Sequence, residues 1–140
     1  MFYSNDRNDM RQMYVDAWRH HRERLPMEPV QFGIAEVIAE HPEYHTLLEG
    51  DSDLGKDWTP EGGAENPFLH MGMHLTIREQ VGTDRPAGIA RIHTQLSRKL
   101  GSPHEAEHVM MESLGEVLWR AQREGILPDD QAYLENLKNL

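Results

Sequence analysis

Apolar residues recur every three or four positions along most of this 140-residue chain. That spacing places them on one face of an α-helix, whereas no stretch shows the strict alternation that is typical of a strand. Prolines, glycines and helix-capping residues divide the apolar stretches into separate units. The pattern predicts an all-α fold, in which residues 1–140 form a single compact bundle of about five to seven helices.

Two helices and a short third one are predicted before residue 50. The first, which Ser4 or Asn5 would cap, carries one apolar stripe: Met10, Met13, Tyr14, Ala17, Trp18 and His21. The second, which Pro29 would open, carries another: Val30, Ile34, Val37, Ile38 and His41. Because Pro42 lacks the N–H that a continuous helix uses, we expect the third helix to be separate and short.

Four further helices are predicted after residue 66 from their start and stop signals. Asn66-Pro67 and Ser102-Pro103 each place a proline directly after a capping side chain, as at many helix starts. Pro86 and Pro128 would open the other two helices, and Gly101 fits the end of a helix.

Residues 49–66 are predicted to form one long loop, because they contain four glycines, a proline and many polar residues. A structureless connection of this length is unusual in a compact domain, so the segment could be a lid, a binding loop or a flexible link.

Asp51, Asp53 and Asp57 match positions one, three and seven of a calcium-binding loop. Lys56 and Gly62 stand where that loop needs glycine and glutamate, so a solvated loop is favoured.

The composition excludes several classes of function. The net charge of −10 argues against nucleic acid or an anionic membrane as partner, since phosphates bind clustered Lys and Arg. The chain has no cysteine, which removes disulfides, thiolate metal sites and a thiol nucleophile. The N-terminus lacks the pattern of a secretory signal, and no stretch has the length of an apolar membrane span. We therefore expect an acidic cytoplasmic protein.

Histidines stand out because they occur in pairs four residues apart. Six of the nine form three such pairs: His41/His45, His70/His74 and His104/His108. Random placement would give about 0.5 pairs of this spacing. On a helix, residues four apart lie on one face, so that two imidazoles can bind one metal ion. A helical wheel places His70 and His74 on the inward face of their helix.

These pairs support a metal-site hypothesis for a helical bundle. The candidate ligands are His41, His45, His70, His74, His104, Glu107 and His108. Imidazole ligands favour a divalent ion such as iron or zinc, in a one-metal or two-metal site, and no organic cofactor is implied. Glu105 and His108 form one copy of the E-x-x-H pattern of di-iron bundles, which use two. The sequence does not select a reaction and leaves open whether the protein is an enzyme.

The alternative hypothesis is a non-catalytic helical adaptor or homodimerisation module. Its histidines would be core residues with ordinary hydrogen bonds. The long predicted helix and the residues Tyr133, Leu134 and Leu137 would then present an apolar surface to a protein partner or a second copy. Methionines near the histidine pairs are interpreted as core fillers rather than copper ligands.

Three blocks of the chain resemble a family described only as a domain of unknown function, DUF1841. The blocks are His41-Pro42-Glu43-Tyr44-His45, residues 66–75 (NPFLHMGMHL) and residues 107–116 (EHVMMESLGE). The resemblance covers nearly the whole chain. It implies a small, cytosolic bacterial protein and supplies no activity.

Overall fold

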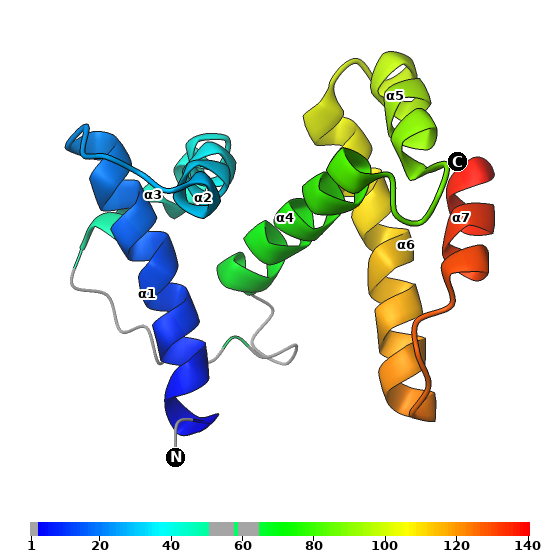
Figure 1. Cartoon of the computed structure of the whole chain (residues 1–140), viewed down its shortest axis with the longest axis horizontal. Coiled ribbons are helices and arrows are strands. Elements are labelled where there is room, and N and C mark those ends of the chain that lie inside the picture. Colours follow the sequence, from blue (N-terminus) through cyan, green and yellow to red (C-terminus); the bar gives the residue numbers. More distant parts are fainter. Residues whose placement is uncertain (1–2, 51–57, 59–64) are drawn as a thin grey trace. The chain divides into compact units, whose positions relative to one another are not determined.

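The computed structural model describes residues 3–50, 58 and 65–140, and these residues form α-helices and contain no strand (Figure 1). In chain order the elements are α1 (Tyr3–Arg22), α2 (Pro29–Ala39), the 3-10 helix η1 (Pro42–Tyr44), α3 (His45–Glu49), α4 (Pro67–Thr83), α5 (Ile89–Leu100), α6 (Pro103–Glu124) and α7 (Asp130–Lys138). The predicted all-α class is therefore confirmed. Most of the predicted loop at 49–66, including the calcium-loop comparison, lies outside the described residues.

Contacts within the chain divide it into two units, Met1–Leu75 and Thr76–Leu140. The first unit holds α1, α2, η1, α3 and the beginning of α4. The second holds the remainder of α4 and α5, α6 and α7. A single domain over residues 1–140 stays a prediction, and each unit is described by itself below.

The core of the first unit is built from the inward faces of its four α-helices. Its buried members are Tyr14, Ala17, Trp18, Ile34, Val37, Ile38, Leu48, Phe68 and Met71. The Trp18 indole N–H donates a hydrogen bond to Glu49 Oε2 at 2.8 Å, which joins α1 to α3. Four residues of the predicted stripes are exposed: Met10 and Met13 at 48% each, Val30 at 56%, and His21. They stand at the edge of their helices' apolar faces, so that part of each stripe stays in water.

The second unit packs α5, α6 and α7 around a separate apolar core. Buried residues come from each helix: Ile89, Ile92 and Leu96; Ala106, Met110, Leu114, Val117 and Ala121; Tyr133, Leu134 and Leu137. Tyr133 also donates a hydrogen bond from its hydroxyl to Gln80 Oε1 at 2.9 Å, which connects α7 to α4. The expectation that Tyr133, Leu134 and Leu137 form an exposed contact surface is therefore wrong, because α7 buries this face within its own unit.

Several predicted helix ends are confirmed by their capping interactions. Asn66 Oδ1 accepts from the Phe68 and Leu69 backbone N–H groups at the start of α4. Ser102 caps α6 by accepting from the Glu105 N–H, and Gly101 ends α5 with a φ of +96°, which glycine adopts without strain.

Two helix starts were predicted too early. Helix α5 begins three residues after Pro86, and Asp129 rather than Pro128 sets the start of α7, since its carboxylate caps that helix.

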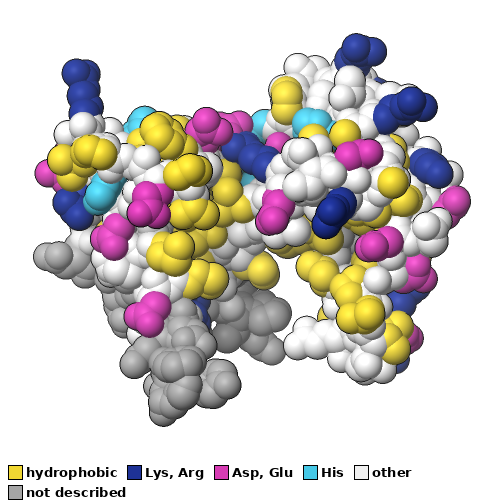
Figure 2. All heavy atoms as spheres, viewed as in Figure 1, with side chains coloured by type: hydrophobic (Ala, Val, Ile, Leu, Met, Phe, Trp, Pro, Cys, Tyr) yellow, Lys and Arg dark blue, Asp and Glu magenta, His cyan; other side chains and the backbone are white. Residues whose placement is uncertain are grey.

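Among the described residues, no helix combines the length and apolarity needed to cross a membrane. On the face drawn in Figure 2, hydrophobic side chains show between charged groups of both signs.

Candidate metal centre

The start of α4 fixes the position of two candidate ligands. The Asn66 cap and Pro67 set the first turn, and the helix then carries His70 and His74 on one face, one turn apart. His74 is completely buried, and the His70 side chain is 14% exposed. The inward orientation that the helical wheel predicts for both residues is thus confirmed.

A third imidazole reaches this face from the end of α2. The helix ends at Ala39, and His41 has φ −128° and ψ 69°, so it stands outside any helix and directly before Pro42. The His41 ring is buried, and its centroid lies 5.0 Å from that of His70 and 4.8 Å from that of His74. The His70 and His74 centroids are 4.9 Å apart. Three imidazoles therefore converge within the first unit.

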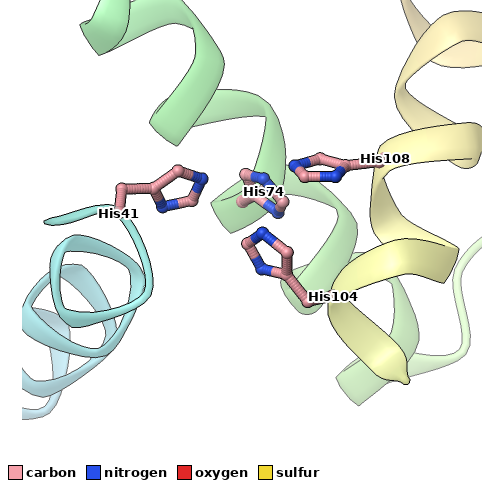
Figure 3. A group of neighbouring side chains, drawn as sticks. All are labelled: His41, His74, His104 and His108. Atoms are coloured by element: carbon pink, nitrogen blue, oxygen red, sulfur yellow. The ribbon is translucent and has the colours of Figure 1, made fainter. Parts of the chain in front are cut away.

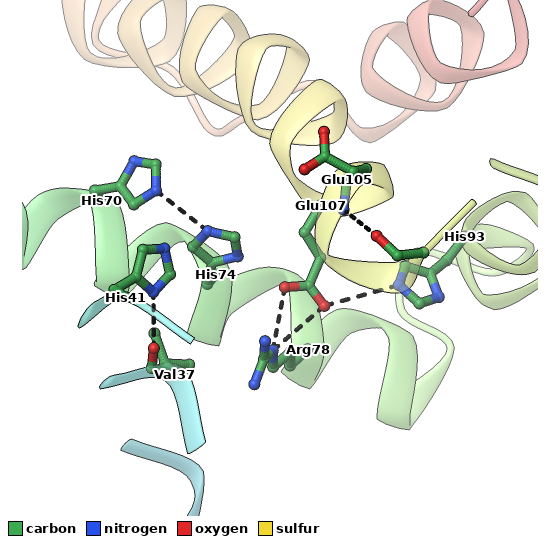
Figure 4. A network of polar contacts seen from close by, with 9 residues as sticks. Val37, His41, His70, His74, Arg78, His93, Glu105 and Glu107 are labelled. Atoms are coloured by element: carbon green, nitrogen blue, oxygen red, sulfur yellow. Dashed lines mark hydrogen bonds and ion pairs between the residues drawn. The ribbon is translucent and has the colours of Figure 1, made fainter. Parts of the chain in front are cut away.

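Hydrogen bonds to the protein fix which nitrogen two of these rings present. His41 Nδ1 lies 2.7 Å from the Val37 carbonyl oxygen (Figure 4). His70 Nδ1 lies 2.8 Å from Glu65 Oε1. Both oxygens can only accept, so each Nδ1 carries a hydrogen and donates it. In the neutral rings Nε2 then keeps its lone pair. Carbonyl and carboxylate partners of this kind orient histidine ligands in metal proteins.

The shortest contact inside the group joins two ring nitrogens. His70 Nε2 and His74 Nε2 are 3.3 Å apart (Figure 4). Two lone pairs at this distance repel each other, so a proton or a cation must lie between the nitrogens. Two nitrogens each at about 2.1 Å from one tetrahedral ion would be about 3.4 Å apart, and about 3.0 Å apart at a right angle. The observed separation lies between these values.

The surroundings of His41 favour its neutral form and hold its ring in place. Burial lowers the pKa of His41, and the neighbouring His74 and His70 lower it further, against the raising effects of the Val37 carbonyl and Glu43. Neutral imidazole is the form that binds metal. Tyr44 stacks on His41 with a centroid separation of 5.4 Å. Burial, with smaller contributions from Glu65 and Glu43, raises the pKa of Tyr44 to about 12, so its phenol is neutral at pH 7.

The remaining candidate of the first unit, His45, has a different environment. Its Nε2 lies 2.8 Å from the Ile38 carbonyl oxygen, and its ring packs on Trp18 with centroids 4.5 Å apart. Because Pro42 interrupts the helix, His41 and His45 do not share one helix face despite their spacing. Sequence spacing alone did not reveal this difference.

In the second unit, His104 and His108 occupy the first turns of α6. Their rings meet edge to face with centroids 4.3 Å apart. This pair keeps the helical geometry that the spacing predicts. Figure 3 labels both residues, and their side chains extend from α6.

Glu107 forms a buried ion pair in the second unit. The Arg78 Nε–H lies 3.1 Å and 3.3 Å from the two Glu107 carboxylate oxygens, and His93 Nε2 is 3.8 Å from Oε2 (Figure 4). The Glu107 side chain is only 4% exposed. The partner of this buried acid is therefore an arginine.

Two acids near the histidines were not among the predicted site residues. Glu65 contacts His70 from the segment before α4, and no spacing rule connects residues on either side of a helix start. Glu105 did have a signal, since it directly follows His104 and stands three residues before His108.

No curated protein and no solved structure matches the chain. One family model does, and it covers residues 6–139, which includes every candidate ligand. Because the match extends over nearly the whole sequence, the chain belongs to the family described as domain of unknown function DUF1841.

Proposed function

We propose that the protein binds a divalent first-row metal, zinc or iron, through His41, His70 and His74. The observation that carries the proposal is the 3.3 Å separation of the His70 and His74 Nε2 atoms beside the third ring. Three imidazoles, two of them oriented by hydrogen bonds to the protein, are a ligand set that suits zinc and iron. Glu65 and the Val37 carbonyl would act as outer partners that hold the ligands in position.

A hydrogen bond between His70 and His74 would give a similar separation without metal. Such a bond needs only two rings, however. It does not explain why a third imidazole, that of His41, packs against both of them. Burying three imidazoles together is costly unless their nitrogens are satisfied. A shared cation satisfies several of them at once, which is why we favour metal over a hydrogen bond alone.

His104 and His108 are proposed as metal ligands within the second unit. His45 and Glu107 are left out, because His45 Nε2 is bound to the Ile38 carbonyl oxygen and the Glu107 carboxylate is bound to Arg78. The metal content of His74→Ala and of His108→Ala, measured separately, tests the ligands of each unit one at a time.

Elemental analysis of protein purified without an affinity tag tests the proposal. We expect about one or two equivalents of zinc or iron per chain, either as purified or after anaerobic reconstitution. Less than about 0.2 equivalents of every ion after reconstitution would overturn metal binding.

Thermal unfolding with and without the ion assigns the ligands. An ion that binds only the folded state raises the melting temperature, and His74→Ala should lose most of this increment. His20→Ala is the matched control, since His20 bonds to the Pro26 carbonyl oxygen, away from the three rings. Equal increments in wild type and His74→Ala would remove His74 from the site.

A further inference from the structure

The first turns of α6 carry a sequence pattern with a defined chemistry. Residues 104–108 read His-Glu-Ala-Glu-His, which matches H-E-x-x-H. On a helix this pattern places two histidines on one face for a zinc ion, and the glutamate after the first histidine serves as general base. The structure supplies the required context, because all five residues lie within α6 (Pro103–Glu124) and the two rings are in contact.

The structure distinguishes the two glutamates within this pattern. Glu107 is buried and bound to Arg78. The Glu105 side chain is 60% exposed, and its Oε1 lies 3.8 Å from His108 Nδ1. In Figure 4 the two carboxylates point to different sides of the start of α6. Glu105 is therefore the acid that borders both a candidate ligand and solvent, where a substrate and water can reach it.

A first-turn acid also has an ordinary structural role. It interacts favourably with the positive end of the helix dipole, and Ser102 with Glu105 fits the sequence of a capping box. The Ser102 side chain does accept a hydrogen bond from the Glu105 N–H at 3.1 Å. A backbone N–H makes that contact, so it would survive any change of the Glu105 carboxylate. A test must therefore separate loss of stability from loss of chemistry.

We propose that Glu105 is the general base of a metal-dependent hydrolase, with His104 and His108 as two of the metal ligands. This inference rests on the proposed function, because the ion must polarise the attacking water. Glu105 removes a proton from that water while its oxygen bonds to the carbonyl carbon of an ester or amide. The bond from this carbon to the leaving oxygen or nitrogen then breaks, and the proton passes from Glu105 to the leaving group.

A catalytic zinc takes three protein ligands and keeps one position for water. His104 and His108 would supply two of them. Zinc analysis of alanine variants of the remaining histidines reports which residue supplies the third. The substrate class is an ester or amide that can reach the exposed Glu105 carboxylate.

Hydrolysis of p-nitrophenyl acetate and of alanine p-nitroanilide by the zinc-loaded full chain tests the inference. Zinc content is measured on the same samples. We expect Glu105→Gln to keep its zinc and its melting temperature while kcat/KM falls by about 10²-fold or more. Glu112→Gln, an exposed acid on the same helix, is the matched control and should behave as wild type.

Three results would contradict the inference, and they differ in whether they also contradict metal binding. Equal rates for zinc-loaded wild type and Glu105→Gln remove the base and leave metal binding intact. A zinc-loaded wild type that is no faster than the chelated protein on both probes excludes the hydrolase and again leaves metal binding intact. Wild type that holds no zinc or other ion refutes the proposed function and the inference together.

Discussion

At His70, one hydrogen bond decides what the imidazole can do. The contact with Glu65 Oε1 at 2.8 Å places the ring hydrogen on Nδ1, so that Nε2 faces His74 as an electron-pair donor. A carboxylate in this position also makes the ring a stronger ligand. Glu65 is mostly exposed, with 66% of its side chain accessible, and its contribution to folding stability is therefore small. Its effect should appear in metal affinity instead.

We predict that Glu65→Gln weakens metal binding by about 10- to 100-fold and leaves the metal-free melting temperature nearly unchanged. The amide is similar in size but carries no charge to polarise the His70 ring. Competition with a chelator of known affinity measures the change. Glu36→Gln, an exposed acid of α2, is the control. Equal affinities for Glu65→Gln and Glu36→Gln would show that the carboxylate does not support the ligand.

Tyr133 gives a prediction about alkaline pH. Burial, with a smaller effect of Asp130, raises the pKa of Tyr133 above its usual range near 10. The folded state thus prefers the neutral phenol, and this contribution to stability is present below about pH 10 and is lost as the pH rises further. Tyr133→Phe should be less stable by about 1 kcal/mol at neutral pH, because it loses the hydrogen bond to Gln80.

Urea unfolding of both proteins between about pH 8 and about pH 11 checks this prediction. The variant should lose less stability over this interval than wild type, since it lacks the buried phenol. Parallel curves would mean that Tyr133 titrates alike in the folded and unfolded chain.

Residue patterns predicted part of this site and missed the rest for identifiable reasons. The inward faces of His70 and His74 follow from helix geometry, which spacing reveals directly. His41 joins them through the chain turn at Pro42, and Glu65 does so from outside α4. Neither position follows a helical repeat. Which partner a buried acid has, as for Glu107 and Arg78, depends on packing between helices and is not encoded by spacing.

At the level of elements, the Arg78–Glu107 ion pair connects the second half of α4 to the beginning of α6. Both helices have well-defined starts, since Asn66 and Ser102 cap them. Capping residues act within one turn, which is why these starts could be read from the sequence. The starts after Pro86 and Pro128 could not, because a proline tolerates several positions in the turn before a helix.

We predict that Glu107→Ala lowers the free energy of unfolding by about 2–3 kcal/mol. Removal of one partner of a buried pair leaves the other charge uncompensated, and the 25% exposure of Arg78 reduces the usual cost of this change. Glu112→Ala on the exposed side of α6 should change stability by less than about 0.5 kcal/mol. Denaturant unfolding compares the two variants.

The combined variant Arg78→Met/Glu107→Leu separates a structural role from metal binding. It should recover most of the lost stability, because two apolar side chains replace the pair without a buried charge. Metal content should stay at the wild-type level in Glu107→Ala and in the double variant. Loss of metal in both variants would indicate that Glu107 is a metal ligand after all.

For the whole molecule, the two units share one helix, α4, and each carries its own group of histidines. The all-α class could be predicted because every helix has an apolar stripe. The division into two units could not, because neither the composition nor the spacing of apolar residues changes at the boundary. The apolar surface expected on α7 failed for a related reason. An apolar stripe shows that a face is covered, and the fold alone decides whether the chain itself or a partner covers it.

X-ray absorption spectroscopy of the zinc- or iron-loaded protein tests the central claim most directly. The account predicts at least three imidazole nitrogens around the ion, at about 2.0–2.2 Å, and a loss of imidazole scattering in His74→Ala. A coordination shell made of oxygen atoms alone, or one that is identical in wild type and His74→Ala, would contradict it.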